Sequence, residues 1–156
     1  MSKNDGFSMV ELLVTVAIIA IIVVIAIPNL ITSKEAANEA SAIKACRTLG
    51  SAEIAYMGSN NQQYTDIQTL AANNYVDSRF TNAAGFLGYT YAAGTVTNAV
   101  GGGPPPAGFE FVATPLTGGG RYTYGLAADQ VIRYLGAVSG VAAPAGLSVG
   151  DPVGKR

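Results

Sequence analysis

The pattern of hydrophobic positions divides the chain into an N-terminal apolar segment and a longer remainder with mixed polarity. Thr15 is the only polar residue among the sixteen at positions 12–27. Met9-Val10 and Leu30-Ile31 extend this segment to the roughly 20 residues that a helix needs to cross a bilayer. A strand of that length would be unusual, and a single strand in lipid would leave its backbone polar groups unsatisfied. The pattern therefore predicts a membrane-spanning helix.

Helical periodicity continues beyond this segment. Pro28 lacks an N–H donor and crowds the preceding turn, so it should either kink the helix or end it. Apolar positions then recur at steps of three or four, which predicts an amphipathic continuation whose apolar stripe faces a globular domain. The stripe contains Ala36, Ala40, Ile43, Cys46, Gly50, Ile54 and Met57. Glu35, Glu39, Lys44 and Glu53 are expected mostly on the other faces.

These patterns predict one helix from Phe7 to about Met57, with a membrane half at 7–30 and an amphipathic half at 31–58. Cys46 falls on the stripe and is expected to be a buried small hydrophobic residue.

The sequence that follows the predicted helix indicates a small antiparallel sheet. Residues 59–86 form a connecting loop with a short helix capped by Thr65 or Asp66 that runs to about Ala72. Segments 88–91, 109–112, 122–125 and 131–134 alternate as strands do, and glycine-rich breaks at 101–106 and 118–120 precede the second and third. The expected fold is α+β, with the long N-terminal helix packed on the aromatic face of a four-stranded meander at 87–135. The Ala/Gly/Pro-rich tail at 136–156 is either an irregular cover on the sheet or a mobile segment.

Composition narrows the possible functions. The 156 residues carry 9 Lys and Arg against 10 Asp and Glu, which argues against a direct nucleic-acid site. The absence of His excludes a Ser-His-Asp triad, a Cys-His dyad and a His-ligated metal. The single Cys46 excludes an internal disulfide. Glycine runs lack the Lys and Ser/Thr of a phosphate-binding loop. We therefore predict no catalytic residue, no cofactor and no metal.

Glu11 is the unusual residue of the apolar segment, because a carboxylate within a bilayer costs about 2.5–3.5 kcal/mol. The segment alone also fits a removable secretory signal, with Lys3 as its basic start, or an ordinary membrane anchor. Cleavage after Gly6 would give Phe7 a cationic α-amino group four residues from Glu11, on the same helical face. That cut would create a cation able to neutralise Glu11.

The run Gly6-Phe7-Ser8-Met9-Val10-Glu11-Leu12-Leu13-Val14, followed by the apolar helix and Pro28, resembles the class III prepilin-like N-terminus of type IV pilins and type II secretion pseudopilins. The resemblance implies that prepilin peptidase cuts between Gly6 and Phe7, on the cytoplasmic side, and N-methylates Phe7. Residues 1–6 would be the leader peptide. Glu11 would pair with the terminal amine of a neighbouring subunit. Segments 111–116, 120–122 and 129–133 also resemble the sheet of pseudopilin-like pilins.

The resemblance implies a structural subunit rather than an enzyme. Such a subunit is stored as a single-pass protein in the bacterial inner membrane. The inner-membrane pilus assembly machinery then builds identical or related subunits into an extracellular helical filament for adhesion, twitching motility or DNA uptake. The alternative within the family is a pseudopilin that forms a short periplasmic pseudopilus. A membrane-anchored binding module or enzyme that never polymerises is the alternative from another class.

Overall fold

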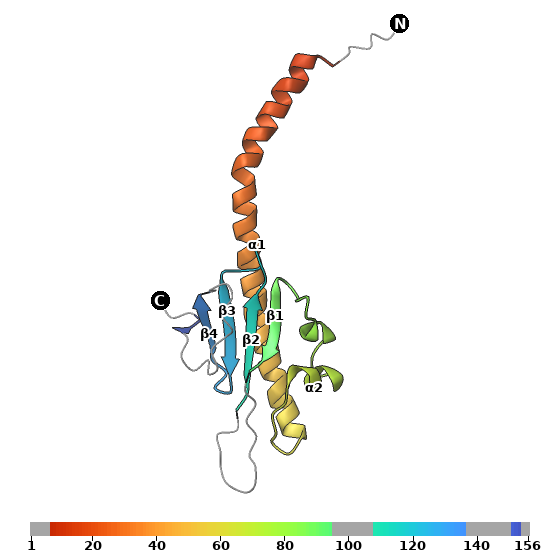
Figure 1. Ribbon diagram of the computed structural model, residues 1–156, viewed down its shortest axis with the longest axis vertical. Helices are drawn as coiled ribbons and strands as arrows, with labels where there is room; N and C mark the ends of the chain where they lie inside the picture. The colour runs from red at the N-terminus through yellow and green to blue at the C-terminus, as the bar shows by residue number, and fades with distance from the viewer. Residues whose placement is uncertain (1–6, 95–107, 137–150, 154–156) are drawn as a thin grey trace. The chain divides into compact units, whose positions relative to one another are not determined.

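The computed structural model describes residues 7–94, 108–136 and 151–153. The chain divides into two compact units, residues 1–34 and 35–156, and helix α1 (Met9–Ser59) contributes to both. The predicted leader at 1–6, the glycine- and proline-rich break at 101–106 and most of the predicted tail lie outside the described residues. The described part has the α+β architecture that the sequence predicts: a long N-terminal helix and an antiparallel sheet (Figure 1).

Helix α1 is continuous over 51 residues and contains Pro28, so the interpretation that the helix ends at Pro28 is wrong. Its bounds differ by two residues from the predicted ones at each end. The helix stops where Asn61 and Gln62 take positive φ angles of 51° and 59°. The amide of Gln62 then donates to the carbonyl of Met57 at 3.1 Å. A left-handed residue and a long-range amide bond of this kind are common at helix C-termini.

The sheet has strand order β1-β2-β3-β4-β5, and every neighbouring pair is antiparallel. Its strands are β1 (Tyr89–Ala93), β2 (Glu110–Pro115), β3 (Tyr122–Ala127), β4 (Ile132–Gly136) and β5 (Asp151–Pro152). The first four strands confirm the predicted meander. The short β5 adds to the edge of β4, where Arg133 pairs with Pro152 and Tyr134 with Asp151. Part of the predicted tail is therefore joined to the sheet.

Aromatic residues gather on one face of the sheet, as predicted. The register places Tyr91 beside Ala113, Ala113 beside Tyr124 and Tyr124 beside Tyr134, in a row across four strands. Because side chains alternate between faces along a strand, Tyr89 and Phe111 lie on the same face. These two residues share a hydrophobic core with Cys46 and Leu49 of α1. The sheet therefore packs on the C-terminal half of α1 through this aromatic face.

The buried face of α1 differs from the predicted stripe. Cys46 and Gly50 are buried as expected, whereas Ala36, Ala40 and Ile54 are exposed. The buried residues of α1 are Glu39, Ala42, Ala45, Cys46, Leu49, Gly50, Ala52 and Glu53. The expectation that Glu39 and Glu53 face solvent is therefore wrong. Both carboxylates are buried because backbone amides of other segments bind them.

Glu39 connects α1 to the segment that precedes β3. Its Oε1 accepts hydrogen bonds from the Arg121 backbone amide at 2.8 Å and from Arg121 Nε at 3.2 Å. The guanidinium Nη2 approaches the other oxygen, Oε2, at 3.4 Å. Both oxygens of this buried carboxylate are thus satisfied, by an amide and by a cation.

Glu53 connects α1 to the connecting loop, where its Oε1 accepts a hydrogen bond from the Thr65 backbone amide. The next residue, Asp66, is the N-cap of α2 (Ile67–Ala72) and accepts from the Thr69 amide at 2.7 Å. The predicted short helix, its cap and its end at Ala72 are therefore confirmed. A 3₁₀ turn, η1 (Ser78–Thr81), leads on toward β1.

Cys46 is fully buried in the core, as predicted. Burial raises the pKa of its thiol to about 12, because the charged thiolate loses its hydration.

Candidate processing and assembly site

The start of α1 brings together Phe7, Ser8 and Glu11. Phe7 is exposed. The Val10 amide donates to Ser8 Oγ at 3.3 Å, and the Ser8 amide donates to Glu11 Oε2 at 3.2 Å. This reciprocal arrangement is a capping box, which satisfies two amides that the first helical turn leaves without partners. Gly6, the other half of the predicted cleavage site, lies outside the described residues.

The capping role of Glu11 was missed in the sequence, although the spacing Ser8-x-x-Glu11 is its signature. The sequence analysis paired Glu11 only with the terminal amine that cleavage would create at Phe7. In the structure the carboxylate bonds to the amide of Ser8, one residue after the predicted cut. Glu11 therefore has a partner within its own chain.

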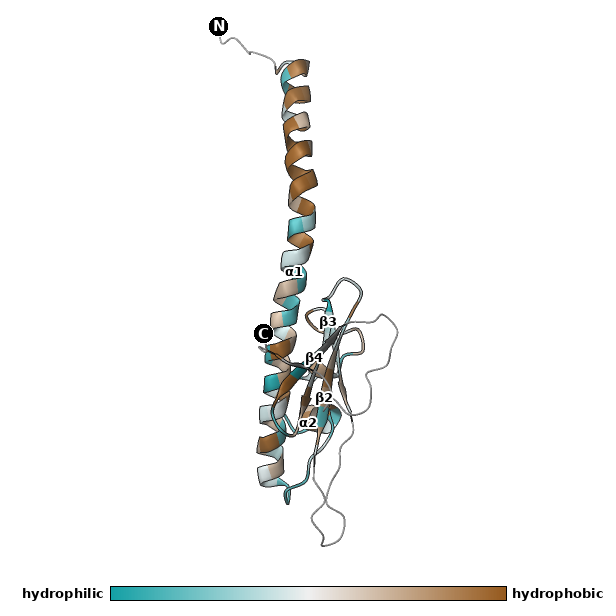
Figure 2. Ribbon diagram, turned by 90° about the vertical axis from the view of Figure 1, so that its left-hand side faces the viewer, coloured by the Kyte–Doolittle hydropathy of each residue, from teal (hydrophilic) through white to brown (hydrophobic). Residues whose placement is uncertain are grey.

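The first half of α1 is exposed and apolar. The large hydrophobic residues from Met9 to Ile31 range in exposure from 42% at Val23 to 85% at Met9. Figure 2 shows this half of the helix almost uniformly in the hydrophobic colour. The helix is long and apolar enough to cross a membrane, although a signal sequence near an N-terminus meets the same test. Side chains of this kind need lipid or other protein around them.

Pro28 lies inside the helix and has no amide to donate to the Val24 carbonyl one turn earlier. Polar side chains near it bond to backbone carbonyls. Asn29 Nδ2 donates to the Ile25 carbonyl at 3.1 Å, and Thr32 Oγ1 donates to that of Pro28 at 2.7 Å. The helix thus continues through a turn with a missing backbone bond. The predicted kink stays a prediction.

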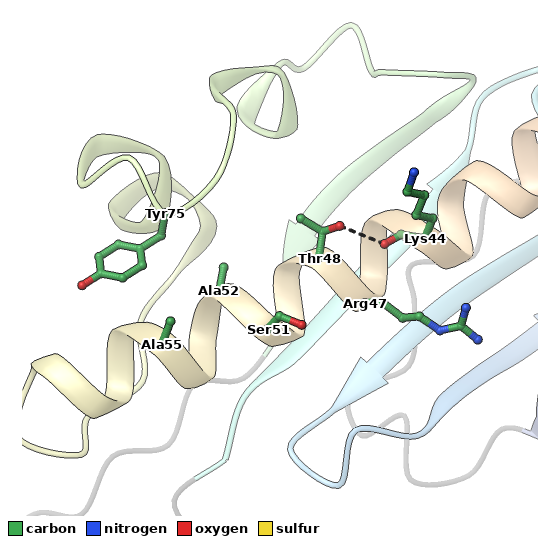
Figure 3. A pocket seen from close by; sticks show the side chains of 7 residues that line it. All are labelled: Lys44, Arg47, Thr48, Ser51, Ala52, Ala55 and Tyr75. Carbon is green, nitrogen blue, oxygen red and sulfur yellow. Dashed lines mark hydrogen bonds between the residues drawn. The ribbon is translucent and has the colours of Figure 1, made fainter.

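A shallow hollow of about 440 Å³ lies beside α1 and Tyr75 in the second unit (Figure 3). It is lined by Lys44, Arg47, Thr48, Ser51, Ala52, Ala55 and Tyr75. The Thr48 hydroxyl already donates to the Lys44 carbonyl at 3.1 Å. The lining includes no carboxylate, thiol or imidazole. Within the described ranges, no group of three Cys, Asp or Glu side chains is placed to hold a metal ion.

Residues 1–27 match the family model described as the prokaryotic N-terminal methylation motif. This match shows that the chain carries the class III prepilin-like signal of type IV pilins and pseudopilins. The motif and the long apolar N-terminal helix support a membrane-anchored precursor of the pilin or pseudopilin type, and the signal implies processing by prepilin peptidase. The motif indicates a structural subunit rather than an enzyme. Comparison of the chain with curated proteins and with solved structures gives no significant match.

Proposed function

We propose that the chain is a structural subunit of a type IV pilus. In this proposal, prepilin peptidase cuts between Gly6 and Phe7 and N-methylates Phe7. The observation that carries the proposal is the methylation motif at residues 1–27, which coincides with a helix whose apolar side chains are exposed. The same motif favours this interpretation over a removable secretory signal or an ordinary anchor.

The exposed apolar helix explains why storage and assembly belong together. Each large apolar side chain gains about 1.5–3 kcal/mol when it leaves water, so the helix cannot be transferred from lipid to water. It can leave the inner membrane only if other helices replace the lipid. Repeated contacts between unlike surfaces of identical chains produce an open helical filament. The proposed filament is extracellular and serves adhesion, twitching motility or DNA uptake.

Glu11 has two successive partners in this proposal. Before cleavage it accepts the Ser8 amide and closes the first helical turn. After cleavage the Phe7 amine of a neighbouring subunit provides a positive charge at the same depth. Because an unpaired carboxylate is costly inside an apolar core, this pairing fixes the axial position of one subunit against the next.

Pro28 has a mechanical role in the proposal. The turn around it lacks one backbone hydrogen bond, so it needs less energy to bend or unwind than the turns on either side. A helix that bends there can follow the curvature of a filament.

Mass spectrometry of the N-terminus of the purified protein tests the processing step. We expect the mature chain to start at methylated Phe7. Gly6→Leu should keep the leader attached, while Asn4→Ala, in the same leader, should be processed normally. A mature start at Phe7 in Gly6→Leu, or an intact Met1 in the unmodified chain, would contradict the proposal.

Shearing of intact cells separates the pilus from the alternative, a pseudopilin of a type II secretion system. Filaments released from the surface should contain this chain if it is a pilin. A processed chain that stays in the cell envelope would support the short periplasmic pseudopilus instead.

A further inference from the structure

Glu53 is a buried carboxylate that lacks half of its expected hydrogen bonds. The side chain is fully inaccessible to solvent. Its Oε1 accepts from the Thr65 amide, but its Oε2 is buried without a hydrogen-bond partner among the described residues. The other buried carboxylate of α1, Glu39, bonds through both oxygens to Arg121. Glu53 therefore stands in an environment that favours a neutral group over a charged one.

The charges around Glu53 add to this effect. On the side of the connecting loop and α2 it faces the Thr65 amide and the carboxylate of Asp66. No Lys or Arg in the described ranges forms an ion pair with it. Desolvation is the main cause that raises the pKa of Glu53 to about 7; the Thr65 hydrogen bond opposes it, and the charge of Asp66 adds to it.

We propose that Glu53 is a proton-operated latch: its neutral carboxyl group holds the loop at residues 60–66 against α1, and its ionised form favours release of that loop. When Glu53 is neutral, burial of Oε2 costs much less than burial of a charge would, and Oε1 still accepts from Thr65. When Glu53 is ionised, a half-satisfied charge remains buried beside Asp66. Opening of the loop relieves this state, because it admits water to Oε2.

The structure limits which residues move. On one side of the loop, α1 ends at Ser59. On the other side, Ile67 and Leu70 of α2 are buried in the core and hold that helix in place. Residues 60–66 lie between these two fixed points. The expected event is therefore a local opening rather than unfolding of the second unit.

The direction of the pH dependence follows from the sign of the shift. The pKa of the buried carboxyl group is above the ordinary glutamate value of 4.5, which the group regains when the loop opens. The open state therefore binds fewer protons than the closed state between these two values. Opening should increase as pH rises from about 4.5 to about 7 and then level off. This property belongs to residues 53–66 and holds whether or not the chain polymerises.

Amide hydrogen exchange at Thr65, measured by NMR on the full chain in detergent micelles, tests the latch. The matched variant is Glu53→Gln, which keeps an oxygen acceptor for Thr65 and does not titrate. The exchange rate of the unmodified chain divided by that of Glu53→Gln cancels the intrinsic pH dependence of exchange. We expect this ratio to rise about 25-fold between about pH 5.5 and about pH 8. A constant ratio would overturn the proposal.

Two further measurements keep the proposal testable if Glu53→Gln does not fold. Carbon NMR of the Glu53 carboxyl group in the unmodified chain should give a titration midpoint near 7, and a midpoint below about 5 would overturn the latch. Asp66→Asn keeps the cap acceptor but removes the neighbouring charge, so it should move the midpoint to lower pH. Glu35→Gln, on the same helix but outside its buried face, should leave the midpoint unchanged. A midpoint that responds to Glu35→Gln and not to Asp66→Asn would also overturn the proposal.

Discussion

At the scale of single residues, Gly50 lies where α1 meets the side chains of β3 and of the turn after it. A Cβ atom at this position would overlap the side chain of Leu126 in β3 and lie 2.7 Å from Gln130 Oε1. Gly58 lies in the same helix, but a Cβ there would meet nothing within 4 Å. The two glycines therefore separate the effect of packing from that of helix propensity.

We expect Gly50→Ala to lower the free energy of unfolding by about 1–3 kcal/mol, because overpacking outweighs the gain in helix propensity. Gly58→Ala should leave the free energy unchanged or raise it by up to about 1 kcal/mol. Denaturant titration of the full chain in micelles, followed by tyrosine fluorescence, measures both. Equal stability of the two variants would show that the sheet does not press on Gly50.

Residue-scale prediction from the sequence succeeded where the pattern was local and failed where partners are distant. Cys46 was correctly placed in the core because it is small, apolar and in phase with its neighbours. Glu39 was placed on the solvent side, because its partner Arg121 is 82 positions away. Glu53 was misplaced for the same reason, since its amide partner lies 12 positions along the chain. The charge of a glutamate predicts that it is exposed. Only the folded chain shows which backbone amides are close enough to bind it and allow it to be buried.

At the scale of elements, the buried face of α1 is bounded by two glutamates that bond to other segments. Glu39 accepts from the segment before β3, and Glu53 accepts from the loop before α2. Hydrophobic residues between them bury area without fixing a direction. The two carboxylates supply directional bonds that set the axial position of α1 against the sheet and the loop.

Substitution of Glu39 tests this arrangement. Glu39→Ala leaves the Arg121 amide without its acceptor and should lower the free energy of unfolding by about 1–3 kcal/mol. Arg121→Ala keeps the amide bond and removes only a guanidinium that is 55% exposed, so its effect should be smaller, about 0–1 kcal/mol. Glu35→Ala, outside the buried face, should change stability by less than about 0.5 kcal/mol. A larger effect of Arg121→Ala than of Glu39→Ala would show that the ion pair, and not the amide bond, matters.

Most elements were predictable because their signals are local. The apolar positions keep their helical spacing on both sides of Pro28. Within the predicted strands, apolar and polar residues alternate, and turn residues separate one strand from the next. β5 was missed because Asp151-Pro152 has too few residues to show alternation. Proline is tolerated at a sheet edge, so nothing in the sequence marks these residues as a strand or excludes them from one.

At the scale of the whole molecule, the question is whether the charge of Glu11 or its capping bond matters for assembly. Both roles are compatible with the structure, because Glu11 stands at the exposed start of α1 and accepts the Ser8 amide. Glutamine at this position of a capping box also accepts that amide but carries no charge. Glu11→Gln therefore separates the two roles.

We expect both Glu11→Gln and Glu11→Ala to reach the membrane in normal amounts and to reduce sheared filaments at least about tenfold, because neither variant can neutralise a terminal amine. Quantitative immunoblots of membrane and sheared fractions measure both effects. Thr15→Ala, a polar substitution in the same helix, should assemble normally. Normal filaments from Glu11→Gln together with none from Glu11→Ala would assign the role to capping and contradict the pairing.

Because Cys46 is buried, the chain can be labelled at an introduced cysteine. It is the only sulfhydryl in all 156 residues. Its high pKa and its full burial keep it away from alkylating dyes while the protein is folded. A cysteine introduced at an exposed position such as Ser51 would therefore be the sole reactive handle, and fluorophores or spin probes could follow the chain through export and polymerisation without first removing a native competitor.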